Sequence, residues 1–258
     1  MTQSSAADLR LAALRAEVRR IENGGRAVAV PCLPFGVAAV DSRLAGGGLA
    51  IAALHEAAPA TPALGDDAAA TLFLAAVAAR LSRARGEGIV LWALSRRDLF
   101  APGLAQAGLT PERLLYAECR RDEEVLAVME EGLRARSLAA VVGEAGSVAM
   151  AAARRLQLAA EEGGTTALLL RRRRRGGADP LAAPSPAVTR WRLACAPSEK
   201  LAIPAVGRAR WHVELARQRG GTAHDWILEA PDAEARLALP ARSAHRPDQA
   251  RGAQRRAA

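Results

Sequence analysis

Residues 57–72 lie where a phosphate-binding loop would join a short apolar strand to the following helix. A working loop of this kind reads G-x-x-x-x-G-K-[ST]; its backbone N–H groups hold the phosphates and its lysine reaches the outer ones. Here the segment reads AAPATPALGDDAAATL, and the chain's single lysine is Lys200. Pro59 and Pro62 supply no backbone N–H group. The segment therefore lacks the groups that bind nucleotide phosphates.

Gly65, Asp66 and Asp67 form the remnant of this loop, at the expected start of the next helix. A carboxylate at a helix start accepts hydrogen bonds from the free N–H groups that would otherwise bind an anion. We therefore expect Asp66 and Asp67 to cap the helix themselves and to repel a phosphate.

An ATPase site also needs two acids, one that holds a metal ion and one that activates water. Neither has its expected form in this sequence. The apolar run 138–142 ends in Gly143-Glu144, and the run 89–94 continues into SRRD without a glutamate at its exit. Glu144 could hold a metal ion, but with no phosphate to bridge we interpret it as a cap or a remnant. The sequence predicts a protein that is not an enzyme, with no catalytic residue, no cofactor and no metal.

Other residue types that do chemistry are scattered. Ser147 follows a glycine but lacks the second glycine of a nucleophile elbow. The three cysteines form no C-x-x-C pair, which favours a reducing, cytoplasmic setting. The histidines have no metal-ligand spacing, so we interpret them as structural or surface residues. These cysteines and histidines are Cys32, Cys119, Cys195, His55, His212, His224 and His245.

The densest charge cluster is a run of five arginines at the end of an expected strand. Two interpretations remain open: a solvated loop, or a surface that contacts DNA phosphates or an acidic partner, without reading base sequence. Under the second interpretation, two arginines on the preceding helix add to the same face. The seven residues are Arg154, Arg155, Arg171, Arg172, Arg173, Arg174 and Arg175.

The net charge of +9 and the pI near 11.0 favour an acidic partner such as nucleic acid. Nearly all cations are arginine, however, and alanine is very abundant, as expected of a GC-rich coding sequence. The charge alone therefore leaves both explanations open.

The hydrophobic pattern predicts an α/β fold with a mostly parallel sheet flanked by helices, followed by antiparallel strands. Continuous apolar runs indicate strands at 50–56, 88–94, 113–117, 138–142 and 166–170. Amphipathic segments indicate helices at 66–85, 98–107, 122–137 and 149–162. Alternation of every second residue indicates antiparallel strands at 188–193, 210–215 and 225–229. Trp191, Trp211 and Trp226 lie in these last strands, where a shared hydrophobic face is favoured over a base-stacking platform.

Four segments follow from this pattern. Residues 1–25 contain an amphipathic helix (8–22), and residues 26–175 form the core with its degenerate phosphate loop. Residues 176–240 add the antiparallel strands, and residues 241–258 are expected to be a disordered basic tail. No apolar run is long enough to span a membrane, and the N-terminus is polar, so neither a membrane segment nor a secretory signal is expected.

Several segments, in order over most of residues 8–240, carry a resemblance to known proteins. They are Leu33–Gly36, Asp41, Gly46–Leu49, His55-Glu56, Arg154–Ala160, Leu168–Arg171, Thr189–Trp191 and Arg210-Trp211. The glycine-rich stretch within residues 33–49 resembles the entrance to a RecA-like ATPase core of the P-loop NTPase type. Taken together, the segments resemble the ImuA family.

The resemblance implies a RecA-like accessory protein of DNA-damage-induced translesion synthesis. It implies an ImuB-like polymerase-family partner, and also contact with RecA and an error-prone DNA polymerase. The alternative is a SulA-type inhibitor of cell division, which is also similar to RecA in fold and lacks nucleotide chemistry. Such inhibitors are usually shorter and have no need of an arginine run or a basic tail.

Overall fold

The computed structural model describes residues 31–173, 176–198 and 207–240. The helix expected within 1–25, the tail 241–258, and Arg174 and Arg175 lie outside these residues. The elements, in chain order, are β1 (Cys32–Leu33), α2 (Ala38–Asp41), β2 (Leu49–Ala50), β3 (Leu54–Pro59), α3 (Leu64–Ala84), β4 (Val90–Leu94), α4 (Ala101–Gln106), a 3-10 turn (Pro111–Arg113), β5 (Leu114–Glu118), α5 (Asp122–Arg134), β6 (Ala140–Ala145), α6 (Met150–Gly163), β7 (Thr166–Arg171), β8 (Thr189–Ala196), β9 (Arg210–Gln218) and β10 (His224–Glu229).

The main sheet has eight strands in the order β10-β9-β8-β3-β7-β6-β4-β5. The six strands from β8 to β5 pair in parallel, and β9 and β10 continue the sheet antiparallel beyond β8. β1 and β2 form a separate two-stranded sheet. The expected α/β fold with C-terminal antiparallel strands is confirmed.

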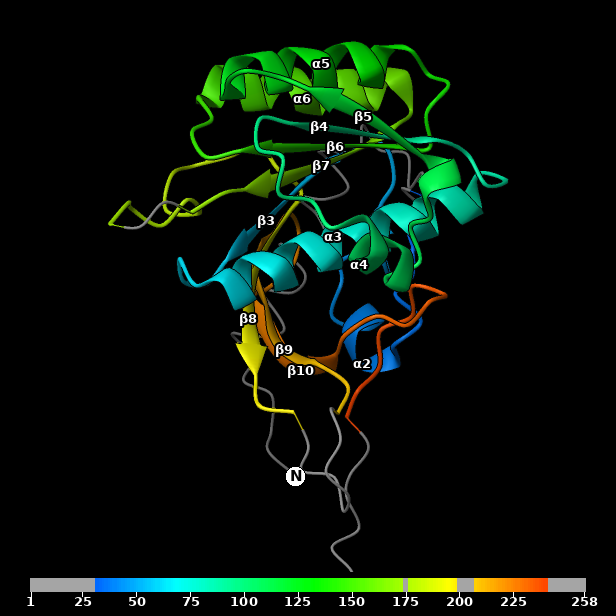
Figure 1. Ribbon diagram of the computed structural model, residues 1–258, viewed down its shortest axis with the longest axis vertical. Coiled ribbons are helices and arrows are strands. Elements are labelled where there is room, and N and C mark those ends of the chain that lie inside the picture. Colours follow the sequence, from blue (N-terminus) through cyan, green and yellow to red (C-terminus); the bar gives the residue numbers. More distant parts are fainter. Residues whose placement is uncertain (1–30, 174–175, 199–206, 241–258) are drawn as a thin grey trace, which may run out of the picture.

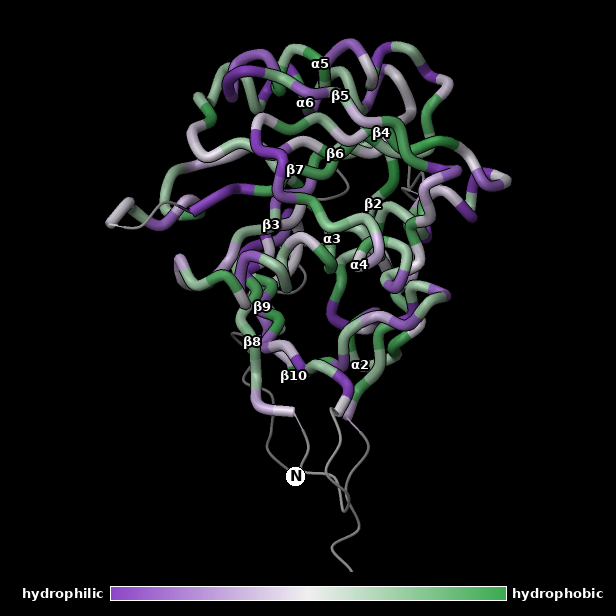
Figure 2. Tube along the Cα trace, viewed as in Figure 1, coloured by the Kyte–Doolittle hydropathy of each residue, from purple (hydrophilic) through white to green (hydrophobic). Residues whose placement is uncertain are grey.

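Helices cover both faces of the parallel strands. α5 and α6 pack on one face, and α3 and α4 lie on the other (Figure 1). Strands β3, β4, β6 and β7 are therefore buried throughout, which explains why their sequences are mainly apolar. Figure 2 shows these central strands as mainly hydrophobic, with a hydrophilic stretch where β7 ends.

Close packing of α5 on this sheet depends on a glycine in β6. A Cβ atom at Gly143 would lie 2.1 Å from the sulfur of Met129, which belongs to α5. Any larger residue there would clash with the Met129 side chain, which would have to move from its place between α5 and β6. The glycine that precedes Glu144 is thus explained by helix–sheet packing.

Two element boundaries differ from the sequence prediction. The expected strand 50–56 is divided, because Ala52 has a positive φ of 56° and β3 begins only at Leu54. The helix expected from Asp98 begins at Ala101, with Pro102 in its first turn. Asp98 therefore lies in the loop after β4, where its carboxylate can reach neighbouring strand ends.

Within the described residues, no helix combines the length and the apolar character needed to cross a bilayer.

Candidate functional site at the carboxyl edge of the sheet

The degenerate loop lies at the carboxyl edge of the parallel strands. Residues 60–63 connect β3 to α3, and in open α/β sheets ligands bind outside this edge. The N-cap residue of α3 is Ala63, and no side chain bonds to the free N–H groups at the helix start. The free N–H groups of a helix start therefore lie at this edge, and what can approach them depends on the side chains around them.

Arg172 lies at this edge and forms ion pairs with three carboxylates. Its Nη2 atom lies 2.6 Å from Oε2 of Glu144, and its Nε atom lies 2.9 Å from the same oxygen. Nη1 donates to Asp67 at the start of α3, and Nη2 lies 3.2 Å from Oδ1 of Asp98 after β4. The Arg172 side chain is only 10% exposed. One guanidinium therefore joins the ends of β7 and β6, the loop after β4 and the first turn of α3.

The charges in this cluster depend on one another. Burial raises the pKa of Glu144, while Arg172 and the indole N–H of Trp92, 2.7 Å from Oε1, oppose that rise. Burial also disfavours the charged form of Arg172, but its carboxylate neighbours, Glu144 foremost, raise its pKa above the ordinary value. The arginine is thus held as a cation in a place where a phosphate-binding site would require room for an anion.

The prediction that Asp66 and Asp67 cap α3 is wrong. Asp66 accepts hydrogen bonds from the backbone N–H of Thr61 (3.1 Å), its hydroxyl (2.6 Å) and the N–H of Cys195 (2.8 Å). Asp67 binds Arg172. The helix starts at Leu64, two residues earlier than expected, so these carboxylates lie beyond the cap position and serve other partners.

The prediction for the arginine run also needs correction at its first two residues. Successive residues of a strand point to opposite faces, so Arg171 binds Glu56 on one face while Arg172 binds Glu144 on the other. Both side chains are buried and paired with internal acids, so neither guanidinium group is exposed to DNA or to a partner. Arg173 donates to the carbonyl of Ala60, which ties the degenerate loop to the end of β7.

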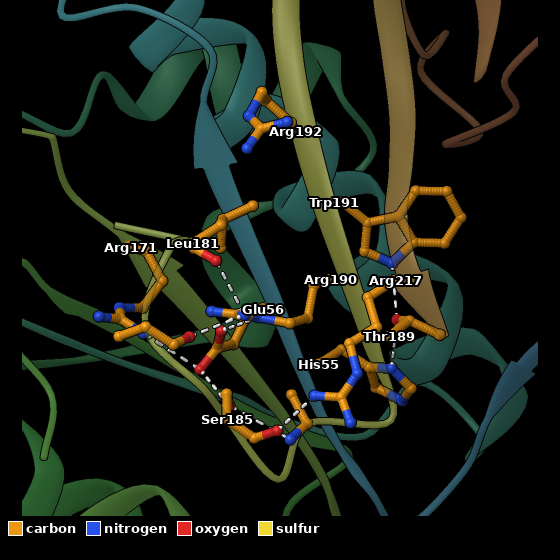
Figure 3. Close-up of polar contacts among 12 residues, drawn as sticks. His55, Glu56, Arg171, Leu181, Ser185, Thr189, Arg190, Trp191, Arg192 and Arg217 are labelled. Carbon is orange, nitrogen blue, oxygen red and sulfur yellow. Dashed lines mark hydrogen bonds and ion pairs between the residues drawn. The ribbon is translucent and has the colours of Figure 1, made fainter. Parts of the chain in front are cut away.

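Glu56 forms the centre of a second buried cluster, shown in Figure 3. Its side chain is fully buried; Oε1 accepts from Arg171 (3.2 Å) and Ser185 (2.7 Å), and Oε2 accepts from Arg190 (2.8 Å). Arg190 also donates to the carbonyls of Leu181 and Ala183. The cluster thereby fixes the segment between β7 and β8 against the sheet.

His55, next to Glu56, is structural, as the sequence predicted. Burial lowers its pKa to about 4, so the imidazole is neutral at physiological pH. Its Nε2 atom lies 2.8 Å from the carbonyl of Ala50 and its Nδ1 atom 2.7 Å from the hydroxyl of Thr189. Trp191 donates its indole N–H to that same hydroxyl (2.7 Å). The carbonyl can only accept, so Nε2 carries the proton and donates to it, and Nδ1 accepts a hydrogen bond from the Thr189 hydroxyl.

The comparisons place this chain among known proteins. No family model matches it. Over 214 residues it is 38% identical to Protein ImuA of Caulobacter vibrioides, covering 81% of this chain and 87% of that protein. The chain belongs to the ImuA family. ImuA from a second strain of the same species matches equally well. SulA from Pseudomonas aeruginosa aligns with 46% of this chain and 96% of its own, at 24% identity and a TM-score of 0.40, too low to carry an argument.

The residues on which the ImuA resemblance rested are largely structural here. Phe35 packs against Phe73 and Trp191, with ring centroids 6.0 and 5.6 Å away. The Asp41 carboxylate accepts from the backbone N–H groups of Phe35 (2.6 Å) and Gly36 (2.9 Å). Trp191, Trp211 and Trp226 are buried in one core, which confirms the predicted hydrophobic face.

Arg154 and Arg155 lie on the exposed side of α6 in this ImuA-family chain. Arg155 pairs with Glu130 of α5 at 3.1 Å, and Arg154 contacts no acid among the described residues. Neither of them contacts Arg171, Arg172 or Arg173. The expected single arginine face is therefore divided, and among these residues only Arg154 is exposed without an ion pair.

The excess positive charge lies mostly outside the described residues. The described ranges contain 23 arginines and 22 acids, whereas the rest of the chain holds 13 of the 36 cations and only 5 of the 27 acids. Internal pairs such as Arg172–Glu144 and Arg171–Glu56 account for part of this balance. Sequence reasoning missed both pairs, although an acid inside an apolar strand needs a cation, a metal ion or hydrogen-bond donors near it.

Proposed function

We propose that this ImuA-family chain is a non-catalytic, RecA-like accessory protein of DNA-damage-induced translesion synthesis, acting in the cytoplasm by assembly. The observation that carries the non-catalytic part is the Arg172 cluster. A strand, loop and helix lie where a P-loop protein binds phosphates, but an internal cation occupies the edge and three carboxylates surround it.

Phosphate binding at this edge would be opposed in two ways. A polyphosphate would have to draw Arg172 away from Glu144, Asp67 and Asp98, leaving the buried Glu144 without a cation. It would then approach those same carboxylates as an anion. The loop offers no lysine in compensation, since Lys200 lies far along the chain. These features favour a scaffold over an ATPase.

The partner assignment rests on the family. An ImuB-like polymerase-family protein is the proposed main partner, with RecA and an error-prone DNA polymerase as further members of the assembly. Direct contact with DNA, independent of base sequence, is proposed for Arg154, for Arg174 and Arg175, and for the basic segment 241–258. Arg154 is exposed and pairs with no acid among the described residues, and the other two segments carry more cations than acids in the sequence.

Two measurements test this proposal. Titration of the full-length protein with Mg-ATP is expected to give no saturable heat, and a low-micromolar dissociation constant would contradict the non-catalytic part. Co-expression with the polymerase-like protein of the same cassette is expected to yield a complex that survives gel filtration. Separate elution of the two proteins, each folded, would contradict assembly.

A further inference from the structure

The two most exposed large hydrophobic residues of the described chain lie next to the Arg172 cluster. Leu64, in the first turn of α3, is 79% exposed, and Phe100, immediately before α4, is 70% exposed. Leu64 precedes Asp67 by three residues and Phe100 follows Asp98 by two, and both acids bind Arg172. Arg172 thus fixes the two helix starts that present these side chains.

Leu64 and Phe100 belong to one apolar strip. Leu64, Ala68 and Leu72 follow one another at intervals of four residues, on one side of α3. Phe100 and Leu72 both lie over Gly103 of α4, where a Cβ atom would be 3.3 Å from the Phe100 ring and 3.8 Å from Leu72. α3 and α4 are neighbours on the face opposite α5 and α6 (Figure 1). We call Leu64, Ala68, Leu72 and Phe100 the α3–α4 ridge.

Two exposed arginines lie in the loop between the end of β4 and Phe100. Arg97 is 82% exposed and pairs with Glu118 at 2.6 Å, while Arg96 pairs with Asp98 at 2.5 Å and is more exposed than that acid. Exposed pairs of this kind contribute little and exchange easily. Arginines beside apolar anchors are typical of protein-binding surfaces.

We propose that the α3–α4 ridge is the docking surface for a segment of the polymerase-like partner that carries apolar anchors flanked by acidic residues. This inference rests on the proposed function and assigns it a surface. The partner's apolar anchors would cover Leu64 and Phe100, and its acidic residues would form ion pairs with Arg96 and Arg97 in place of Asp98 and Glu118. No residue of the ridge was singled out by the sequence, because apolar side chains at a helix start look like core residues.

Charge argues against the other occupants. Residues 1–30 carry five arginines against three acids, and residues 241–258 carry five arginines against one acid, so neither segment complements Arg96 and Arg97. A second copy of the chain would bring the same arginines to the same place. Single-stranded DNA would find one aromatic ring on an otherwise aliphatic strip, which is a poor stacking platform.

The test uses the full-length chain and the purified polymerase-like protein of the same cassette. Leu64→Ser/Phe100→Ser is expected to weaken binding at least about tenfold, as loss of two anchors does. Ile227→Ser/Leu239→Ser is the matched control, since both residues are exposed hydrophobics distant in sequence from the ridge; it should bind like the wild type. Melting curves verify folding, and Leu64→Ala/Phe100→Ala provides a milder second variant.

Charge is tested separately. Arg96→Gln/Arg97→Gln is expected to slow association and reduce its dependence on salt. Arg134→Gln/Arg155→Gln is the control: it also removes two exposed ion pairs, on α5 and α6, and should change neither the association rate nor its salt dependence. Wild-type affinity in the ridge variants would overturn the docking surface alone. So would loss of binding to a single-stranded oligonucleotide with partner binding intact. A wild-type chain that binds no polymerase-like protein would overturn the proposed function as well.

Discussion

Arg171 and Arg172 are adjacent in the chain, yet their guanidinium groups form ion pairs with acids on opposite faces of the sheet. Arg171 lies 3.2 Å from Glu56, and Arg172 lies 2.6 Å from Glu144. The pleat of β7 separates them. Two positions of one arginine run thereby neutralise the two acids that the buried strands β3 and β6 carry, and both belong to the folded core.

Arg172→Ala is expected to lower the free energy of unfolding at neutral pH by about 3 to 5 kcal/mol, because it leaves the buried Glu144 carboxylate without a cation. Glu144→Gln should cost less, since Asp67 and Asp98 still hold Arg172. Urea denaturation of both variants checks this order. Equal stability of Arg172→Ala and the wild type would mean that the cluster does not form in solution.

Arg172→Ala should also change how the stability of the protein depends on pH. Burial already raises the pKa of Glu144, and removal of Arg172 should raise it further above its value in the unfolded chain. A carboxyl whose folded pKa is raised binds more protons in the folded state, so stability falls as pH rises through that range. Relative to the wild type, Arg172→Ala should therefore recover stability as the pH is lowered from neutral toward about 5. A constant difference across this range would contradict the prediction.

His55 gives a prediction of opposite sign. Its pKa is about 4 in the folded protein, against an ordinary value of 6.5. The unfolded chain thus takes up a proton first, and stability is lost as pH falls from about 6.5 toward 4, on the order of 3 kcal/mol in all. His55→Gln should flatten this part of the acid-unfolding curve, whereas His212→Gln, which removes an exposed imidazole, serves as the control. An unchanged slope in His55→Gln would assign the acid sensitivity to other groups.

Most of the fold could be predicted because its central strands are mainly apolar and are separated by amphipathic segments. The place of the candidate site could be predicted as well, from the strand and helix that flank residues 60–63. Its chemistry could not, because Arg172 and Asp67 are 105 residues apart and no local spacing connects them. Asp66 was misassigned partly for the same reason: one of its partners, Cys195, is 129 residues away and comes close only because β8 lies beside β3.

Glu56→Ala should loosen the segment between β7 and β8. It removes the acceptor of Arg171, Ser185 and Arg190, leaving two buried cations without their acid. We expect faster cleavage by trypsin after Arg171, Arg172 and Arg173 under native conditions, because local opening exposes them. Glu123→Ala, at an exposed position, is the control. Cleavage at the wild-type rate would show that the Glu56 cluster does not restrain this segment.

The last prediction concerns DNA and is narrower than the arginine run suggests, because replacing Arg171 or Arg172 would damage the core. Arg154→Gln/Arg174→Gln/Arg175→Gln removes three cations that could neutralise DNA phosphates and should leave the melting temperature nearly unchanged. If these residues bind duplex DNA, binding should be weak and independent of base sequence. The log–log salt slope should then become shallower by about 0.9 for each phosphate that is no longer neutralised. Fluorescence anisotropy with a labelled duplex and a scrambled duplex, over a salt series, measures both properties. Arg43→Gln/Arg120→Gln/Arg236→Gln removes the same charge from other exposed positions and separates local binding from net charge. Equal slopes in the two triple variants would leave net charge as the cause and exclude Arg154, Arg174 and Arg175 as specific DNA-binding residues.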